Sequence, residues 1–332
     1  MDQRISLVIP NYNGARTIGN CLAAVFACGG DGCEVIVVDD CSGDASIDII
    51  KQFPCKLVQL EKHGGASAAR NAGARACSGE VLFFIDADCL LREDTLARVR
   101  ENIASRPADV VIGGTYCAEP ADHGFFSAFQ SVFINYSETK KSAAPDYIAT
   151  HAMVIHRAAF HAAGGFRENF LPILEDVEFS HRLRRLGYRL MIDPLLQVRH
   201  IFGFSLGKSL RNAARKSRYW IAYSLANRDV LSDSGTASNE IKINGVVWLM
   251  TALVLLLSSV AGARWPLMPL PLIWAADLLI NRRQLKAFFA ARGVLFGIGA
   301  ALYYLLVYPA AVWWGTVRGV TDFMRRMKKE PA

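Results

Sequence analysis

The sequence lacks the cysteine spacings that disulfide frameworks and zinc sites require. Its eight cysteines lie between Cys21 and Cys117, with no CxxC pair and no cysteine–histidine set at zinc spacing. A signal peptide is also missing, because the apolar run at residues 5–10 is too short for one. We therefore expect a cytosolic start with reduced thiols. Charged residues make up only 20% of the chain and no repeat is visible, which excludes a disordered or low-complexity protein.

The sequence is instead rich in apolar residues and has an uneven charge distribution. Residues of the AVILMFWYC set make up 52% of the chain. Residues 1–200 carry 20 Lys and Arg against 24 Asp and Glu, whereas residues 201–332 carry 17 against 6. An acidic first part and a basic, apolar second part argue against nucleic-acid binding and predict contact with anionic membrane lipid.

The first 113 residues alternate between strand and helix patterns. Apolar or β-branched runs at 5–10, 34–39, 56–60, 81–86 and 109–113 predict strands, and the segments between them have helical character. This rhythm predicts an α/β fold with a parallel sheet between two layers of helices. Ligands bind such sheets at the carboxyl ends of the strands, so functional residues are expected there.

Two pairs of acids follow predicted strands. Asp86 and Asp88 end an apolar run, and residues two apart on a strand point the same way, which predicts a site for Mg²⁺ or Mn²⁺. The alternative for this pair is a solvated turn. Asp39 and Asp40 end an earlier strand, where a carboxylate either accepts from a ribose hydroxyl or a base N–H, or caps the next helix.

Other candidates lie near helix starts and at the end of a QVRH run. Residues 64–73 place small side chains and Arg70 at the start of a helix, which suits a diphosphate. Glu175 and Asp176 open another helix, where they are either stabilised by its dipole or positioned to take a proton from an attacking hydroxyl. His200 ends a QVRH run and is a candidate contact for a metal or phosphate, with a structural histidine as the alternative.

The C-terminal part has the composition of a membrane-associated region. Residues 205–227 form a basic amphipathic helix, which predicts a helix in the membrane interface, or alternatively one packed on the domain. Uncharged runs at 243–263 and 293–317 are long enough to span a bilayer. The proline-containing segment 265–280 is a third span, a re-entrant element or an interfacial one. Two or three spans are therefore expected, and the aromatic segment 125–136 is a helix that packs on the domain or faces lipid.

Six segments together resemble the family-2 glycosyltransferases of the GT-A fold. SLVIPNYN, EVIVVDDCSGD, GASAARNAG, FFIDADC, GGF and EDVEFSHRLRRLGYRL match that family in order and spacing over about residues 4–200. The resemblance implies a Rossmann-like, mixed or parallel sheet flanked by helices, in a catalytic domain at residues 1–202. An interfacial helix and linker (203–242), a transmembrane region (243–317) and a basic tail (318–332) would follow.

The resemblance also implies roles for individual residues in an inverting transfer of sugar from a nucleotide diphosphate. Asp176, with Glu175 beside it, would be the base that deprotonates the acceptor hydroxyl. Asp88 would be the direct ligand of Mg²⁺ or Mn²⁺, with Asp86 completing the DxD site and His200 as a further candidate ligand. The nucleotide pocket and the neighbouring diphosphate site would be formed by Pro10, Tyr12, Asn13, Asp39, Asp40 and Arg70.

Two departures from the family pattern put the sugar in doubt. The usual GGFDE is GGFRE here, so Arg167 replaces the acid, and the preceding ATHAMVIHR lacks the common small-plus-Asn pattern. The QxxRW motif of processive polysaccharide synthases has only a near miss at residues 215–220.

The expected protein is a multi-pass enzyme of the inner membrane with its catalytic domain in the cytoplasm. The expected donor is a nucleotide sugar, most simply a UDP-sugar. The expected acceptor is a lipid-linked saccharide, because a membrane anchor raises the effective concentration of a membrane-bound acceptor at the enzyme. A polyprenyl-phosphate sugar synthase is the main alternative. A processive synthase, a nucleotide-binding scaffold and a nucleotidyltransferase are the others.

Overall fold

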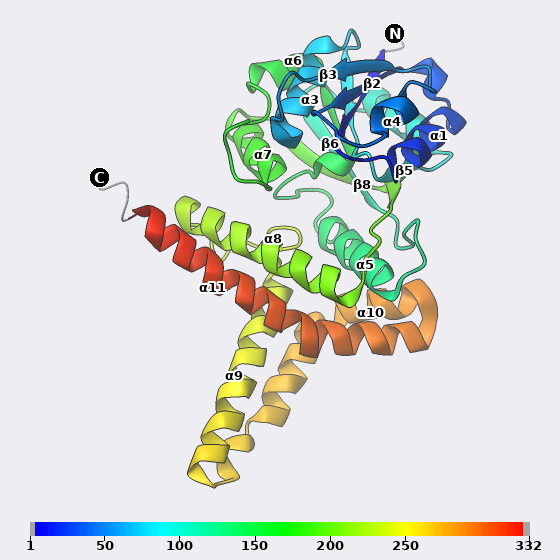
Figure 1. Ribbon diagram of the computed structural model, residues 1–332. Helices are drawn as coiled ribbons and strands as arrows, with labels where there is room; N and C mark the ends of the chain where they lie inside the picture. The colour runs from blue at the N-terminus through cyan, green and yellow to red at the C-terminus, as the bar shows by residue number, and fades with distance from the viewer. Residues whose placement is uncertain (1–3, 328–332) are drawn as a thin grey trace. The chain divides into compact units, whose positions relative to one another are not determined.

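The computed structural model describes residues 4–327, which divide into two compact units. The first unit comprises residues 4–123 and 138–203, and it contains an eight-stranded sheet (Figure 1). The second unit comprises residues 124–137 and 204–327, and it consists of helices and their connecting loops.

The sheet of the first unit is mixed, with strand order β3-β2-β1-β4-β7-β6-β8-β5. The predicted parallel pairing holds for the strands of the first 85 residues, where β1 pairs with β2 and β4, and β2 pairs with β3. Beyond them, β7 is antiparallel to β4 and β6, while β6 and β8 are parallel. The strands are β1 (Ile5–Asn11), β2 (Glu34–Asp39), β3 (Lys56–Gln59), β4 (Val81–Phe84), β5 (Cys89–Leu91), β6 (Val110–Tyr116), β7 (Met153–His156) and β8 (Arg189–His200).

This pairing places the candidate functional residues at one edge of the sheet. Because β7 is antiparallel to both of its neighbours, β1, β2, β4, β6 and β8 all run in the same direction. Their carboxyl ends therefore meet at one edge, where the first residues of β7 and β5 also lie. The segments that follow Asn11, Asp39, Phe84, Tyr116 and His200 all begin there.

Helices cover the sheet and make its core. Apolar side chains of β1, β2 and β4 form a buried cluster with residues of α3, α6 and α7, which fixes these three helices against the sheet. Burial of such clusters is the main contribution to folding stability. The helices of this unit are α1 (Ile18–Ala27), α2 (Ser46–Ile50), α3 (Gly65–Ala76), α4 (Thr95–Ser105), α6 (Arg157–Ala162) and α7 (Glu175–Arg185), with short 3₁₀ turns η1 (Gly30–Gly32) and η2 (Thr150–Ala152).

The second unit is built from five long helical elements. They are α5 (Phe125–Thr139, of which residues 125–137 belong to this unit), α8 (Leu206–Asn227), α9 (Asn239–Ala261), α10 (Leu270–Leu302) and α11 (Tyr308–Met327), with the short turns η3 (Trp265–Leu267) and η4 (Tyr303–Val307). Non-helical angles at Arg292 and Gly293 divide α10 into two parts. Aromatic rings of α5 pack on this unit, since Phe129 lies 5.2 Å from Phe288 and 4.7 Å from Tyr303 between ring centroids.

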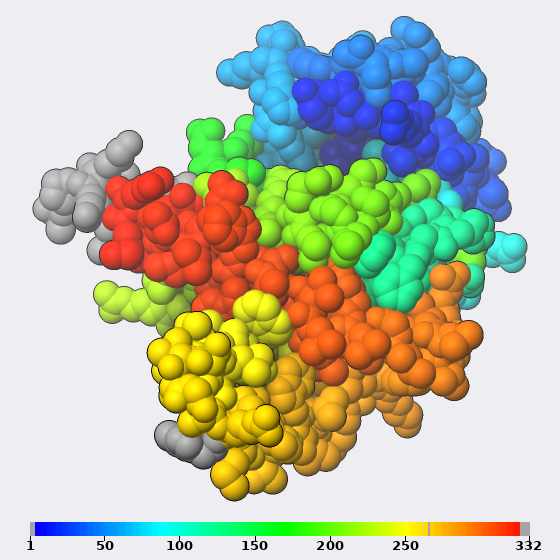
Figure 2. Space-filling view, turned by 60° about the horizontal axis from the view of Figure 1, so that its bottom comes forward, coloured from blue at the N-terminus to red at the C-terminus, as the bar shows by residue number. Residues whose placement is uncertain are grey.

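The C-terminal segments take an arrangement that the sequence left open. Residues 265–280 form η3 and the start of α10, which lies beside α9, where Trp274 Nε1 donates to Thr251 Oγ1 at 3.1 Å (Figure 1). Residues 293–317 continue through η4 into α11, which runs beside α8 (Figures 1 and 2). The amphipathic helix is thus packed on a neighbouring helix, and a contact with lipid stays a prediction.

Two helices are long and apolar enough to cross a bilayer, the first at Asn239–Ala261 and the second within Leu270–Arg325. Length and composition alone support this, so the number of spans stays a prediction. Residues 318–327 of the basic tail form the end of α11, and residues 328–332, with Lys328 and Lys329, lie outside the described residues.

Candidate active site

Side-chain hydrogen bonds join the loops that follow β1 and β2. Asn11 Nδ2 donates to Asp39 Oδ1 at 2.8 Å, and Asn13 Oδ1 accepts from the Gly43 N–H at 2.8 Å. Asp39 is buried, whereas Pro10 at the end of β1 is half-buried. Asp39 therefore ties two strand ends together, and its contact with a nucleotide stays a prediction.

Asp40 lies at the N-terminus of α3. Its two carboxylate oxygens accept from the Gly64 and Gly65 N–H groups at 2.7 and 2.8 Å, and Oδ2 lies 2.9 Å from His63 Nδ1. Anions are stabilised at such a helix start, so Asp40 caps α3 rather than the helix directly after it. Tyr12 is 52% exposed, and its ring centroid lies 4.3 Å from that of His63. These two rings form an exposed aromatic surface at the edge where a base was expected.

Arg70 links two of the acidic motifs. It is only 3% exposed, and its guanidinium donates to Asp86 Oδ1 at 2.6 Å and to Glu175 Oε1 at 2.7 Å. These two carboxylates raise the pKa of Arg70 although burial acts against the charge. Arg70 thus holds the end of β4 and the start of α7 together, and its expected contact with a diphosphate stays a prediction.

The two acids of the DxD segment face different partners. β4 ends at Phe84, so Asp86 and Asp88 lie in the turn before β5 and not on a strand, which corrects the argument from strand alternation. Asp86 is engaged by Arg70, whereas Asp88 Oδ1 lies 3.3 Å from His200 Nε2 at the end of β8. The side chain of Asp88 is 39% exposed, which leaves it open to a ligand.

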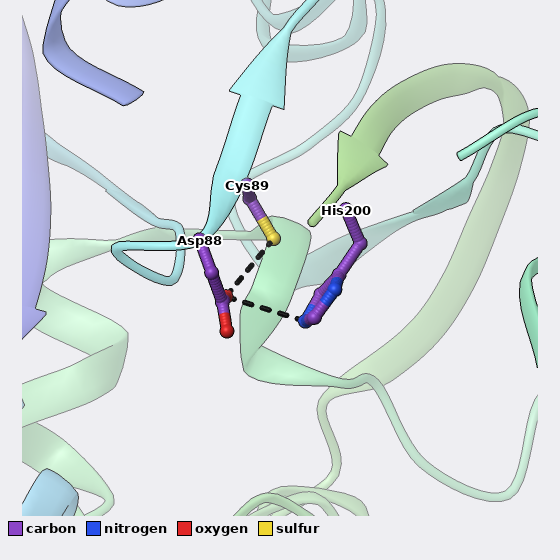
Figure 3. Close-up of side chains that lie close together, drawn as sticks. All are labelled: Asp88, Cys89 and His200. Carbon is purple, nitrogen blue, oxygen red and sulfur yellow. Dashed lines mark hydrogen bonds and ion pairs between the residues drawn. The ribbon is translucent and has the colours of Figure 1, made fainter. Parts of the chain in front are cut away.

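Asp88, Cys89 and His200 form the one group of three metal-ligating side chains among residues 4–327 (Figure 3). Their donor atoms lie within 4.8 Å of one another. Burial and the neighbouring acids raise the pKa of the Cys89 thiol well above its usual value. Burial also acts to raise the pKa of Asp88, but the facing His200 outweighs it and the pKa lies below its usual range. A carboxylate and an imidazole fit Mn²⁺, which accepts both types of ligand.

His200 is held by aromatic rings. Its ring stacks on Phe202 at 4.0 Å and meets the edge of Tyr116 at 4.9 Å, between centroids. Its Nδ1 is buried without a hydrogen-bond partner in the described part of the chain. The rings therefore fix the plane of His200 and direct Nε2 toward Asp88.

The Glu-Asp pair starts α7 from a strained residue. Leu174 has φ +76°, which is uncommon for a side chain of this size, and it is the residue immediately before Glu175. Glu175 is engaged by Arg70, whereas Asp176 Oδ1 accepts from the Val177 N–H at 2.9 Å. Asp176 and Glu175 therefore have different surroundings, and their expected catalytic roles stay predictions.

The GGF segment is fixed by a residue of another motif. Asn71 of α3 donates to the Phe166 carbonyl at 2.8 Å and accepts from the Phe166 N–H at 2.9 Å. Gly165 has φ +65°, and a Cβ there would lie 2.7 Å from Asn71 Oδ1, so only glycine fits. Arg167 points to Glu178 at 3.2 Å and is exposed. The motif thus has a structural function that its sequence did not indicate.

A buried ion pair near these acids was not found from the sequence. His151 Nε2 lies 3.5 Å from Glu138 Oε2, and the His151 ring stacks on Tyr116 at 3.9 Å. Burial lowers the pKa of His151, but Glu138 raises it more, and Asp86 and Asp176 act in the same direction. The net pKa is above its usual value. His151 lies in the ATHAMVIHR segment, which stood out only as a departure from the family pattern.

Comparisons with known proteins agree with this geometry. Residues 6–163 match the model of Glycosyl transferase family 2. Residues 6–163 therefore form a glycosyltransferase family 2 domain. The chain is 30% identical over 131 residues to the glycosyltransferase GlyG of Streptococcus pneumoniae, and 28% identical over 238 residues to the glycosyltransferase AglE of Haloferax volcanii. These matches cover 38% and 69% of the chain.

The chain matches only 44% of the length of GlyG, but 78% of that of AglE. A mannosyltransferase of Pyrobaculum calidifontis, PcManGT, whose structure is a complex with GDP-Man and Mn²⁺, aligns with a TM-score of 0.59. The alignment covers 97% of this chain and 88% of that one, at 19% identity. It shows that the glycosyltransferase domain has the GT-A fold.

Proposed function

We propose that this glycosyltransferase transfers a sugar, with inversion, from a nucleotide diphosphate to a lipid-linked saccharide at the cytosolic face of the inner membrane. The proposal rests mainly on one observation, which is that the four acids of the DxD and Glu-Asp motifs have different neighbours. Arg70 engages Asp86 and Glu175, which leaves Asp88 facing His200 and Asp176 at the start of α7. Two differently placed carboxylates suit a metal site and a general base.

The donor would bind at the carboxyl edge of the sheet. The exposed rings of Tyr12 and His63 suit the base, as in the UDP-sugar expected from the sequence. Asp88 and His200 would hold Mn²⁺ or Mg²⁺. When bound, the ion would offset negative charge on the departing diphosphate. PcManGT has GDP-Man and Mn²⁺ in its structure, so guanosine donors belong in any screen.

Asp176 would do the proton chemistry. Its carboxylate takes the proton of the acceptor hydroxyl while the hydroxyl oxygen attacks the anomeric carbon. The bond from that carbon to the diphosphate oxygen breaks, and the nucleoside diphosphate leaves with the electron pair. Attack from the face opposite the leaving group inverts the anomeric centre. Glu175 and Arg70 would keep the start of α7 in place during this step.

The membrane placement rests on exposed apolar side chains. Leu256, Leu257 and Val260 of α9 and Leu272 and Leu279 of α10 are all more than half exposed. Contiguous apolar surface of this kind marks a contact with lipid or protein. An enzyme held at the bilayer meets a lipid-linked acceptor at a raised effective concentration.

The test uses the full chain in nanodiscs. UDP-, GDP- and dTDP-sugars are screened for nucleoside diphosphate release with Mn²⁺ or Mg²⁺ and a membrane-lipid extract. Asp88→Asn and Asp176→Asn should each lower release about a hundredfold or more. Asp48→Asn, an exposed acid on α2, should leave it unchanged.

Other outcomes would redirect the proposal. If only Asp88→Asn lowers nucleoside diphosphate release, the acceptor is a phosphate, which needs no base. The enzyme would then be a polyprenyl-phosphate sugar synthase. Equal transfer to soluble acceptors would contradict the lipid-linked one. Released pyrophosphate would indicate a nucleotidyltransferase.

A further inference from the structure

The second unit contains a cavity that the chemistry of the first unit does not use. Its volume is about 280 Å³, and all of its lining residues belong to the second unit. Helices α8, α9 and α11 form most of its wall, and residues of α5 and of the loop between α8 and α9 complete it. The cavity thus shares α9 with the exposed apolar surface.

The lining combines apolar walls with positive charge. Trp220, Ile221 and Trp313 are among its many apolar residues, and no Asp or Glu occurs among the described residues that line it. Lys216 of α8 and Lys242 of α9 are its two charged residues. Lys242 Nζ donates to the Ser232 carbonyl, which places this ammonium beside the loop that completes the wall. A ligand of this cavity should therefore be apolar with an anionic group.

A buried polar group in the lining points to a ligand as well. Gln130 of α5 is 1% exposed and lines the cavity, and its Oε1 has no hydrogen-bond partner in the described residues. Buried polar atoms are nearly always hydrogen-bonded in folded proteins. A polar group of a bound molecule would satisfy this amide.

We propose that this cavity binds the phosphate-proximal part of a polyprenyl-phosphate carrier, with the chain against the apolar wall and the phosphate near Lys216 and Lys242. This inference rests on the proposed function, in which the acceptor is a lipid-linked saccharide. It adds that the lipid part of that acceptor binds in this cavity. Small-molecule sites begin at about 300 Å³, so the cavity accommodates only the first part of a long chain. The remainder would extend along the exposed apolar side of α9. Two features favour this ligand. The positive charge of Lys216 and Lys242 complements a phosphate, and the exposed apolar surface of α9 next to the cavity suits a polyprenyl chain.

The test measures binding of radiolabelled geranylgeranyl phosphate to the full chain in phosphatidylcholine nanodiscs. Geranylgeraniol, which has the chain alone, and inorganic phosphate, which has the charge alone, should each compete at least tenfold less well. Lys216→Gln with Lys242→Gln should weaken binding about tenfold or more, since each basic residue contributes to holding an anionic lipid. Arg215→Gln, an exposed neighbour on α8 outside the lining, should change it less than about twofold.

A second pair of variants tests the volume. Val246 lines the cavity from the exposed side of α9, so Val246→Trp should fill part of it and weaken binding without disturbing the core. Leu249→Trp, also exposed on α9 but outside the lining, is the control. Equal binding by all variants would overturn the proposal, as would equal displacement by phosphatidylglycerol, which would indicate a general site for anionic phospholipid.

Sugar transfer by the same variants separates this inference from the proposed function. Transfer to lipid-linked acceptors that Lys216→Gln with Lys242→Gln leaves unchanged would support the function and overturn the site. A second result would have the opposite meaning. If the variants weaken binding of the probe but the enzyme transfers sugar only to soluble acceptors, the binding site is supported and the proposed acceptor is overturned.

Discussion

Both units bury apolar side chains, but they differ in their other inner contacts. In the first, a buried cation joins two acids, as where Arg70 lies between Asp86 and Glu175. In the second, closely packed helices make the contacts, as where Phe129 stacks on Phe288. A change of charge at Arg70 should therefore damage the first unit, and a change of volume between the packed helices should damage the second.

The sequence supplies a separate probe for each unit. All eight cysteines lie in the first unit and all six tryptophans, at positions 220 to 314, lie in the second. Thiol labelling during urea unfolding therefore reports on the sheet, and tryptophan fluorescence reports on the helices.

The largest effect is expected from Arg70→Met. It leaves Asp86 and Glu175 without their cation, and breaking a buried ion pair in this way costs about 3 kcal/mol. The free energy of unfolding measured by thiol labelling should fall by that amount, with little change in the fluorescence transition. Arg98→Met removes only the surface pair with Glu101 and should cost less than about 1 kcal/mol. A similar loss in both variants would refute the role of Arg70.

Gly319→Leu should destabilise the second unit and leave the stability of the first unit unchanged. A Cβ on Gly319 of α11 would collide with the Arg218 carbonyl and with Ile221 of α8, so the larger side chain must separate the two helices. Overpacking of this kind costs about 1–3 kcal/mol, here in the fluorescence transition. Gly207→Ala, whose Cβ would make an ordinary contact with Arg211, should change it little. Movement of the thiol transition alone would contradict the comparison.

The Glu138–His151 pair should give a smaller, pH-dependent effect. Because the folded pKa of His151 is raised, its stabilisation is fully present below about pH 6.5, the unfolded pKa, and is lost as pH rises through the folded value. His151→Gln should therefore cost about 1–2 kcal/mol at pH 6 and progressively less at higher pH, by thiol labelling. A cost that is flat from pH 6 to pH 9 would show that the imidazole carries no charge.

Arg167→Gln should have the smallest effect. Arg167 is exposed, and Glu178 keeps its bond from Arg182 Nη2 at 2.9 Å when Arg167 is lost. Because the exposed Arg167 guanidinium is screened by water and Glu178 stays paired with Arg182, neither probe should shift by more than about 0.5 kcal/mol. A changed preference among donor sugars with unchanged stability would show that the departure from the family's acid affects specificity.

Much of the first unit could be predicted from local patterns. The runs at 34–39 and 5–10 are β2 and most of β1, because buried parallel strands are continuous apolar segments. The helix whose start was expected within residues 64–73 is α3 (Gly65–Ala76). The strands β5, β7 and β8 were missed, because β5 and β7 are only three and four residues long and β8 mixes polar and apolar residues.

The sequence indicates candidate site residues, which stay predictions, but it does not indicate which of them pair. Strand ends gave Asp86 and Asp88, but only the fold shows that one meets Arg70 and the other meets His200. His151 and Glu138 give no local signal, since 12 residues separate them and neither belongs to a recognisable motif. Long-range ion pairs depend on the finished topology, which a single sequence does not state.

The Arg70 ion pairs also bear on the order in which the site forms during synthesis. Arg70 meets Asp86 16 residues later in the chain but must wait for Glu175, 105 residues later. At about 5–20 residues per second, Glu175 leaves the ribosome roughly 5 to 20 s after Arg70. Strands β1, β2 and β4 can leave the ribosome while α7, β8 and His200 are still untranslated. A nascent chain would therefore pass through a period in which Arg70 can bond to Asp86 but has no Glu175 to bond to.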